Sequence, residues 1–310
     1  MTFGQLEILV ALADARGFTL AAQRLGITQS AVSHAIKSLE TEFGTELVVR
    51  RHVQVDFTEI GIRLLSRARE ILGLSETMRQ EAASFRGLKM GSVRVASFGP
   101  SSSLHLLPNI LAEFRKAYPE IDVYVEEGPD EEVVRWIEER KVDLGFVVLP
   151  DDRFETYPLI EDQFVALIPR DHVLADQPAV KLKEICDHPF IMTEAGSEGG
   201  IAQLFSNAGL RPTTRSKTSQ VLSTMALVSQ GEGVAVVAEL ALPLTTGFAG
   251  FKVKPLAPLK KRSVGLALHS NEQATPATRA FIQTALSLKK RKSLLLPPSD
   301  NPLTINIEKG

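Results

Sequence analysis

Cysteine is almost absent from this chain of 310 residues, because Cys186 is the single cysteine. One thiol cannot form an intramolecular disulfide or a multi-cysteine zinc or iron–sulfur site. No two of the six histidines are three to five residues apart, so the H-x-x-x-H spacing of many zinc sites is missing too. The sequence therefore predicts no metal and no other cofactor.

Long hydrophobic runs and a large excess of charge are also missing. No segment approaches the roughly 18–20 apolar residues of a membrane span, and Glu7, Asp14 and Arg16 interrupt the region where a signal peptide would be apolar. We therefore expect a cytoplasmic protein with no membrane partner. The net charge of −2 excludes a polybasic binder, so any binding of nucleic acid depends on a few well-placed groups.

Three short helical patterns occupy the first fifty residues. Apolar side chains recur at helical spacing over residues 3–13, which predicts a first helix that ends at Gly17. Thr19 can then cap a short second helix, LAAQRLG. The third helix, QSAVSHAIKSLETEF, follows the N-cap Thr28, and we expect its buried side to hold Val32, Ile36, Leu39 and Phe43. A short helix, a tight turn and a longer helix form a helix-turn-helix pattern, whose second helix reads DNA.

The opposite side of the third helix is polar and carries no acid. Its side chains, together with the N-cap, are Thr28, Gln29, Ser30, Ser33, His34 and Lys37. Hydrogen-bonding groups near the helix start suit base edges, and a cation suits phosphate. The alternative is an ordinary solvated helix face, and the helix-turn-helix context favours the DNA-contacting interpretation.

A β-hairpin wing is predicted from GTELVVRRHVQVDFTEIG, with Arg50 and Arg51 between two strand-like runs. Two guanidinium groups there can reach the DNA backbone or the minor groove, although such a pair is often plain surface charge.

One long helix is predicted from Thr58 to about Gly87. Leu64, Ile71, Met78 and Phe85 recur every seven residues along it, which favours a coiled-coil pairing with a second copy of the chain. The alternative is that this stripe packs on the downstream part of the same chain.

These segments carry a resemblance. LEILVALADARGFTLAAQRLGITQSAVSHAIKSLETEFGTELVVRR followed by FTEIGIRLLSRAREIL resembles the DNA-binding and linker-helix region of LysR-type transcriptional regulators. The resemblance implies that the polar residues of the third helix face DNA and that Arg50 and Arg51 belong to the wing. The partners it implies are double-stranded promoter DNA, further copies of the chain in a homodimer and homotetramer, a small-molecule effector and RNA polymerase. Family members often have Pro at Ser30 and Arg at His34, so the base preference stays open.

Strands and helices alternate after Gly91, which predicts βαβ units and a mainly parallel sheet. The expected elements include strands at SVRVAS, IDVYVEEG and VDLGFVVL and helices from Leu104 to Tyr118 and from about Pro276 to Lys290. The fold class is thus a winged helix-turn-helix with a linker helix, followed by an α/β effector domain of two Rossmann-like subdomains, similar to periplasmic binding proteins. The expected boundaries are residues 1–58 for the winged domain, 59–89 for the linker helix, 90–163 and 265–292 for the first subdomain, 164–264 for the second and 293–310 for a loose tail.

A ligand cleft is expected between the two subdomains, beyond the carboxyl ends of their strands. The candidate effector contacts are Phe98, Ser101, Ser102 and Ser103 after the first strand, Thr193, Gly196 and Ser197 in the matching loop, and Ser219 and Gln220 across the cleft. Hydroxyls at a helix start suit an anion or a polar oxygen, whereas plain capping needs only one of the serines. Family members often have a hydroxyl where this chain has Val148-Leu149-Pro150, so we expect an acidic effector that is aromatic or partly apolar.

Three functions compete. An enzyme is disfavoured, because Ala195 replaces the first glycine of a G-x-S-x-G elbow and the lone G-x-G in GEGVAV precedes a strand. A solute-binding protein would leave the first ninety residues without a role. The sequence favours a ligand-responsive transcription factor, in which the effector closes the cleft and changes the angle between DNA-binding dimers in a tetramer.

Overall fold

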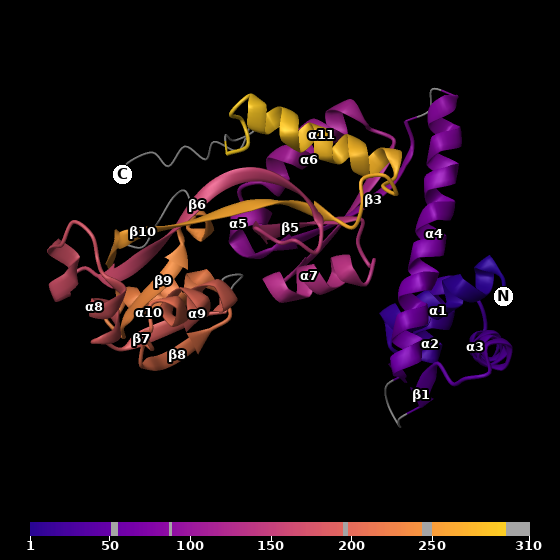
Figure 1. The fold of residues 1–310 in the computed structure, drawn as a ribbon, viewed down its shortest axis with the longest axis horizontal. Coiled ribbons are helices and arrows are strands. Elements are labelled where there is room, and N and C mark those ends of the chain that lie inside the picture. Colours follow the sequence, from indigo (N-terminus) through magenta and orange to yellow (C-terminus); the bar gives the residue numbers. More distant parts are fainter. Residues whose placement is uncertain (51–54, 87–88, 195–197, 244–249, 296–310) are drawn as a thin grey trace, which may run out of the picture. The chain divides into compact units, whose positions relative to one another are not determined.

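A computed structural model describes residues 1–50, 55–86, 89–194, 198–243 and 250–295 of the chain (Figure 1). The contacts divide the chain into two compact units. One unit holds Met1–Lys89 with the short segments Glu138–Lys141 and Glu272–Pro276, and the other holds Met90–Ile137, Val142–Asn271 and Ala277–Gly310. The predicted boundaries of the five sequence segments remain predictions.

The N-terminal unit has the predicted order of helices and hairpin. Its elements are α1 (Phe3–Ala15), α2 (Phe18–Leu25), α3 (Gln29–Phe43), β1 (Val48–Arg50), β2 (Val55–Phe57) and α4 (Glu59–Phe85). Thr28 caps α3 by accepting from the Ala31 N–H, and Thr58 caps α4 by accepting from the Gly61 N–H. Each cap satisfies a backbone donor that has no partner inside its helix.

The core of this unit is made where the first three helices meet the wing. Leu12, Ile36 and Leu39 are fully buried in it, as is Leu47 just before β1. The prediction that Phe43 is buried was wrong, because its side chain is 39% exposed. Phe43 is the last residue of α3, because Gly44 at φ +65° ends the helix directly after it. The chain changes direction there, so no neighbouring element in the described part of the chain fully covers the Phe43 ring.

Gly61 lets the first turn of α4 approach the wing closely. A Cβ added at Gly61 would overlap the carbonyl oxygen of Leu47. The Thr58 N–H donates to that same carbonyl at 3.0 Å. The start of the long helix is therefore fixed against the wing by backbone contact that any larger residue would disturb.

The second unit is an α/β structure built on one eight-stranded sheet. Its strands are β3 (Gly91–Phe98), β4 (Ile121–Gly128), β5 (Leu144–Leu149), β6 (Glu155–Pro169), β7 (Phe190–Thr193), β8 (Thr214–Thr218), β9 (Val234–Ala238) and β10 (Phe251–Leu268). Its helices are α5 (Gly99–Ser103), α6 (Leu107–Ala117), α7 (Asp130–Glu138), η1 (Val173–Asp176), α8 (Leu182–Cys186), α9 (Glu198–Asn207), α10 (Val221–Ser229), η2 (Glu239–Ala241) and α11 (Pro276–Lys290).

Two long antiparallel strands, β6 and β10, join the halves of this sheet. The strand order is β4-β3-β5-β10-β6-β9-β7-β8, and β10 pairs with β6 from one end to the other (Figure 1). We call β6 and β10 the hinge strands. The first lobe is β3–β5 with α5, α6, α7 and α11, and the second lobe is β7–β9 with α8, α9 and α10. β3 pairs in parallel with β4 and β5, and β7 pairs in parallel with β8 and β9, as the alternating pattern predicted.

Helices cover the sheet of each lobe. The rings of Phe114 in α6 and Phe281 in α11 lie 5.3 Å apart between centroids, so these two helices pack together on one side of the first lobe (Figure 1). Val133 and Ile137 of α7 pack on Gly145 of β5, where an added Cβ would lie 2.9 Å from each. The inner strands of the lobes, such as β5 and β9, are buried beneath helices, which explains their nearly continuous apolar sequences, whereas the edge strands β4 and β8 are largely exposed.

The helix predicted from Leu104 to Tyr118 corresponds to α6, which begins three residues later, at Leu107, after a turn. Pro108 stands in the first turn of α6, where its missing N–H costs no intrahelical bond. Pro108 therefore marks a helix start near Leu107, and this signal was present in the sequence. The short helices α5, α8, η1 and η2 were not predicted.

No helix among the described residues is both long and apolar enough to cross a membrane.

Candidate functional site

The exposed face of α3 is the first candidate surface. Gln29, Ser30, His34 and Lys37 are exposed, whereas Ser33 is half-buried. The Thr28 and Ser30 hydroxyls lie 2.9 Å apart and share a hydrogen bond at the helix start. The opposite face buries Val32, Ala35, Ile36 and Leu39, so packing fixes which side chains of α3 point outward.

The wing beside α3 is held by a carboxylate. Glu40 Oε1 of α3 accepts from the backbone N–H groups of Leu47 and Val48 at 2.8 and 3.3 Å. β1 then pairs with β2 in antiparallel register, with Arg50 opposite Val55. The side chain of Arg50 and all of Arg51 lie outside the described residues, so their predicted role stays a prediction.

The predicted heptad stripe of α4 divides into two parts. Leu64 and Ile71 pack against the core of the N-terminal unit. Met78 and Phe85 are 71% and 95% exposed, and Ile62 and Leu74 also expose large apolar surface. Apolar side chains exposed to this degree along one helix are typical of a surface that a partner covers.

The second candidate site is a cavity of about 470 Å³ between the lobes of the second unit. Loop residues after the strands of both lobes line it, as expected for an open α/β sheet. The lining residues are Gly99, Pro100, Leu104, Glu127, Gly128, Pro129, Glu194, Ser219, Gln220, Val221, Leu222, Ala241 and Pro243. Of the predicted effector contacts, Ser219 and Gln220 therefore line the cavity directly.

A buried ion pair lies in the hinge strands next to the predicted serine loop. Arg262 Nε of β10 donates to Asp162 Oδ2 of β6 at 2.7 Å, and Arg262 Nη2 donates to the Ser101 hydroxyl at 2.6 Å. The Arg262 guanidinium also lies 6.0 and 5.7 Å from the ring centroids of Phe98 and Phe164. Arg262 and Asp162 are only 7% and 9% exposed, so water screens their attraction weakly.

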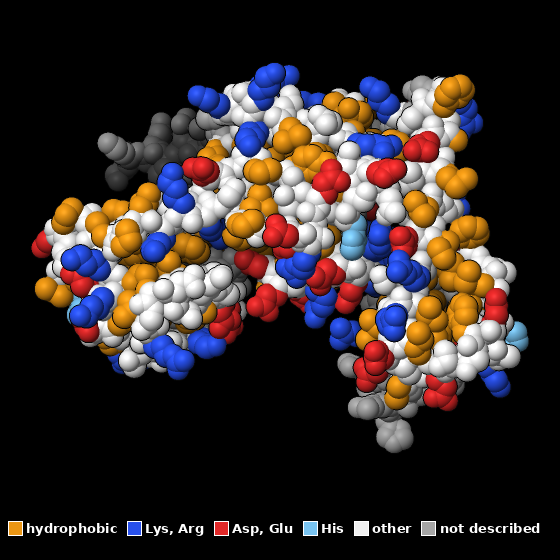
Figure 2. Space-filling view, in the orientation of Figure 1, with side chains coloured by type: hydrophobic (Ala, Val, Ile, Leu, Met, Phe, Trp, Pro, Cys, Tyr) orange, Lys and Arg blue, Asp and Glu red, His pale blue; other side chains and the backbone are white. Residues whose placement is uncertain are grey.

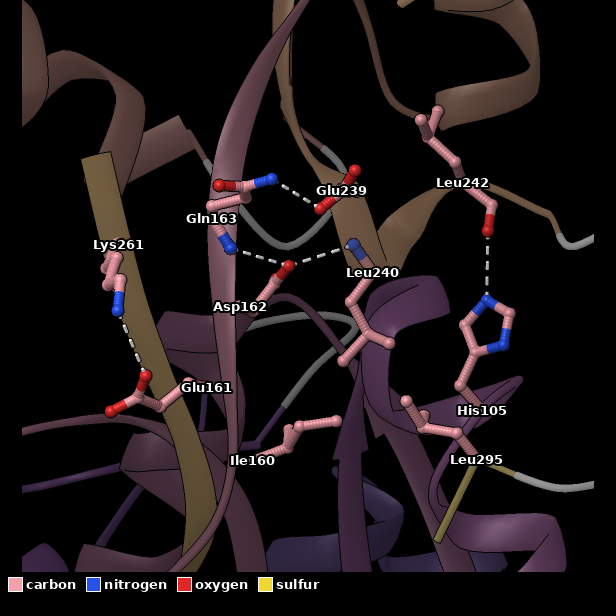
Figure 3. A pocket seen from close by; sticks show the side chains of 10 residues that line it. All are labelled: His105, Ile160, Glu161, Asp162, Gln163, Glu239, Leu240, Leu242, Lys261 and Leu295. Atoms are coloured by element: carbon pink, nitrogen blue, oxygen red, sulfur yellow. Dashed lines mark hydrogen bonds and ion pairs between the residues drawn. The ribbon is translucent and has the colours of Figure 1, made fainter. Parts of the chain in front are cut away.

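The other oxygen of Asp162 continues this network into the second lobe. Asp162 Oδ1 accepts from the backbone N–H groups of Gln163 and Leu240 at 2.8 and 3.0 Å (Figure 3). Leu240 belongs to η2, which follows β9 directly. A chain of hydrogen bonds therefore runs from Ser101 in the first lobe through the hinge strands to the second lobe.

A second cavity, of about 400 Å³, adjoins Asp162. It is lined by residues of both hinge strands and of η2, and by His105, whose Nε2 lies 3.0 Å from the Leu242 carbonyl oxygen (Figure 3). Its acidic residues have partners: Glu239 accepts from Gln163 at 2.7 Å, and Glu161 is 3.3 Å from Lys261. The carboxylates that line this second cavity are therefore already paired with other side chains of the protein.

Asp130 at the start of α7 is the most perturbed carboxyl group near the first cavity. Burial raises the pKa of Asp130 to about 6, and the nearby Arg262 charge opposes the rise. Its Oδ1 atom is buried and has no hydrogen-bond partner among the described residues. The first turns of α7 and α9 lie close together here, since a Cβ on Gly199 would lie 3.8 Å from Glu131 Oε1.

Comparison with known protein families decides the identity. The family model described as "LysR substrate binding domain" matches residues 86–289, and the one described as "Bacterial regulatory helix-turn-helix protein, lysR family" matches residues 3–74. The chain belongs to the LysR family. It is a LysR-type DNA-binding transcriptional regulator with an effector-binding domain, and it is not an enzyme.

Individual relatives agree in length and fold. The uncharacterized HTH-type transcriptional regulator YvbU of Bacillus subtilis is 30% identical over 93% of this chain and 99% of its own. A full-length OxyR variant from Pseudomonas aeruginosa has a TM-score of 0.75 at 22% identity, covering 97% of this chain and 99% of that one. The effector-binding domain of QuiR, solved in complex with shikimate, has a TM-score of 0.57 at 21% identity and covers 65% of this chain and 98% of that one.

The three serines after β3 of this LysR-type regulator, Ser101 to Ser103, make different contacts. The Ser102 hydroxyl donates to the Phe98 carbonyl oxygen at 2.7 Å, and Ser103 donates to the Ser97 hydroxyl at 2.9 Å. These bonds hold the turn between β3 and α5, but the capping alternative was wrong: the N-cap of α5 is Phe98 and that of α6 is Leu106, and neither makes a side-chain capping bond. Ser101 instead meets Arg262, so it is the serine coupled to the hinge.

The remaining predicted contacts lie at different depths. Phe98 and Thr193 are almost completely buried, and Gly196 and Ser197 lie outside the described residues. The sequence reasoning missed Glu127, Glu194 and Asp130 as well as the pair of Arg262 and Asp162. The acidic run from Glu126 to Glu132 was a usable signal, whereas nothing local marks two hinge residues that are 100 positions apart.

Proposed function

We infer that this LysR-type regulator binds promoter DNA as a dimer, through the exposed face of α3 and the wing. The observation that carries this proposal is the outward face of α3, where Gln29, Ser30, His34 and Lys37 stand opposite a completely buried face. Small polar groups near a helix start can reach base edges, and Lys37 further along the helix suits a phosphate. Because chromosomal DNA is the partner, the proposal places the chain in the cytoplasm.

The exposed part of α4 supports self-association. Met78 and Phe85 offer apolar surface that a second copy of α4 would cover, and a dimer would present two α3 helices to a two-fold site. We extend the proposal to a tetramer that contacts RNA polymerase, as the family resemblance implies.

The cleft between the lobes is the proposed effector site. Loop residues of both lobes line it, including Ser219 and Gln220, and Ser101, which accepts from Arg262, follows the lining residue Pro100 in the chain. QuiR, whose effector domain has the same fold, was solved with shikimate, which supports a small organic effector here. An effector that binds one lobe arrangement better than the other would shift the geometry of the assembly and hence transcription.

The DNA-binding part is tested by titrating the full chain with the DNA upstream of its own coding region and with random DNA. Lys37→Ala should weaken binding to both and reduce the slope of log affinity against log salt by about 2 in a dimer. Gln29→Ala should lower the ratio of specific to random affinity by about tenfold, because it removes a base contact. Lys89→Ala removes the same charge away from α3 and should change neither quantity. Equal loss on both DNAs for Gln29→Ala and Lys37→Ala would overturn the assignment of this face.

A further inference from the structure

The cleft carries negative charge on both of its lobes. Glu127, next to the end of β4, lines it from the first lobe, and Glu194, directly after β7, lines it from the second. Among the described lining residues there is no Lys or Arg to balance them. The cleft therefore holds two acidic side chains that disfavour a third negative charge.

Neighbouring cations do not cancel this charge. Lys217 Nζ lies 3.6 Å from Glu194, but it lies closer, at 3.0 Å, to Glu198 and is shared between the two carboxylates. Glu127 forms no ion pair within the described parts of the chain. Glu131 and Glu132 add further acid at the start of α7, and Arg135 pairs with Glu132 at 2.6 Å. Acidic and basic side chains both lie over the region of α7 (Figure 2). The charge left around the cleft is negative.

The buried arginine near the cleft is already occupied. Arg262 donates to Asp162 and to Ser101, so a ligand carboxylate would have to displace a buried ion pair to reach it. Asp130 lies between Pro129 of the lining and Glu131, and its buried Oδ1 atom has no donor among the described residues. A negative ligand would add repulsion beside that carboxyl group, whereas a positive ligand would stabilise its ionised form.

Apolar surface in the cleft gives the second part of the argument. Leu104 of the first lobe is 58% exposed and Leu222 of the second lobe is 54% exposed, and both line the cavity. Pro100 and Pro129 extend this apolar lining. Each lobe thus offers one exposed leucine and one carboxylate to the same cavity, which suits a ligand with an apolar body and a cationic end.

We propose that the effector of this regulator is a small organic cation, an ammonium group on a short apolar or aromatic body, with the ammonium paired to Glu127 and Glu194. This inference rests on the proposed function, in which the cleft is the effector site, and it replaces the expectation of an acidic effector. A cation held by carboxylates of both lobes removes their mutual repulsion and favours the closed cleft, because it attracts each lobe toward the same group.

Three matched probes test the charge preference on the full chain by isothermal titration calorimetry. They are 2-phenylethylamine, 2-phenylethanol and phenylacetate, which share the aromatic body and differ in charge. The amine should bind at least about tenfold more tightly than the alcohol and the acid, and its affinity should fall as salt is added. Glu127→Gln and Glu194→Gln should each weaken the amine by about fivefold to tenfold and leave the alcohol within about twofold.

Glu120→Gln is the control, because Glu120 is an exposed acid next to the opposite end of β4. It should leave all three affinities unchanged. Tighter binding of phenylacetate, an amine affinity that neither Glu127→Gln nor Glu194→Gln alters, or binding of none of the probes would overturn the proposal. The upstream-DNA titration is run on the same protein: sequence-dependent DNA binding with any of these results rejects the cationic effector alone, and its absence rejects the proposed function.

Discussion

The ion pair between Arg262 and Asp162 gives the sharpest prediction about stability. Replacing Arg262 by Met keeps an unbranched side chain of similar reach and removes the charge and both donors. Asp162, 9% exposed, would then be buried opposite no cation, and the Ser101 hydroxyl would lose its 2.6 Å donor. Breaking one side of a buried pair costs about 3–5 kcal/mol, so we expect the free energy of unfolding of the second unit to fall by that amount.

The assay is urea denaturation followed by the fluorescence of Trp136, the single tryptophan, which lies in α7 of the second unit. Lys261→Met is the matched control, because Lys261 is the neighbouring residue on β10 and its partner Glu161 is exposed. Exposed pairs contribute little, so this change should cost less than about 1 kcal/mol.

The double variant Arg262→Met with Asp162→Leu separates the energetic contribution of the ion pair from that of side-chain packing. It removes both charges, so its cost should be well below the sum of the two single changes. A loss for Arg262→Met that is no larger than the loss for Lys261→Met, or strict additivity in the double variant, would refute the reasoning.

Three further predictions follow from single positions. Gly61→Ala should destabilise the N-terminal unit by about 1–3 kcal/mol, because its Cβ would overlap the Leu47 carbonyl, whereas Gly73→Ala, with open space around it in α4, should stabilise it by about 1 kcal/mol. Hydrogen exchange of the α1–α3 amides measures both, and a loss at Gly73 as large as that at Gly61 would contradict them. Met78→Glu should reduce the mass of the assembly in analytical ultracentrifugation and Arg79→Gln should not; an unchanged mass for Met78→Glu would rule out pairing through this part of α4. Asp130→Asn should raise the free energy of unfolding at pH 8 by up to about 3 kcal/mol and leave it unchanged near pH 4. The folded-state pKa of about 6 lies above the ordinary value of 3.8, so ionisation of Asp130 reduces stability as pH rises between these values; Arg262 opposes the raised pKa and Glu131 adds to it. Denaturation curves that give Asp130→Asn no advantage at pH 8 would count against this burial effect.

The local elements were predictable because their signals lie close together in the sequence. Thr28 and Thr58 cap the helices that their positions predicted, and α11 has the bounds that the pattern predicted. The prediction that Phe43 is buried failed because helical spacing alone does not show whether a neighbouring element covers the last residue before Gly44 ends the helix. The start of α6 was predicted three residues early, at Leu104 instead of Leu107, because the apolar spacing was given more weight than Pro108.

Features that depend on distant pairing could not be predicted in the same way. Arg262 stands in KKRSVGLALH and Asp162 in IEDQFVAL, and each resembles an ordinary charge at the edge of a strand. Only the antiparallel register of β10 with β6 places these two residues opposite one another. The heptad stripe of α4 did not show by its spacing which of its residues remain exposed. Leu64 and Ile71 pack against the core of the same chain, whereas Met78 and Phe85 are exposed.

The central claim, that α3 reads DNA, is tested most directly by footprinting the full chain on the DNA upstream of its coding region. Two protected half-sites should be centred one helical turn apart, about 34–36 Å, or a multiple of that distance. Gln29→Ala should abolish the protection at a concentration where Lys89→Ala retains it. Uniform protection along the fragment, or equal protection by the two variants, would contradict the claim.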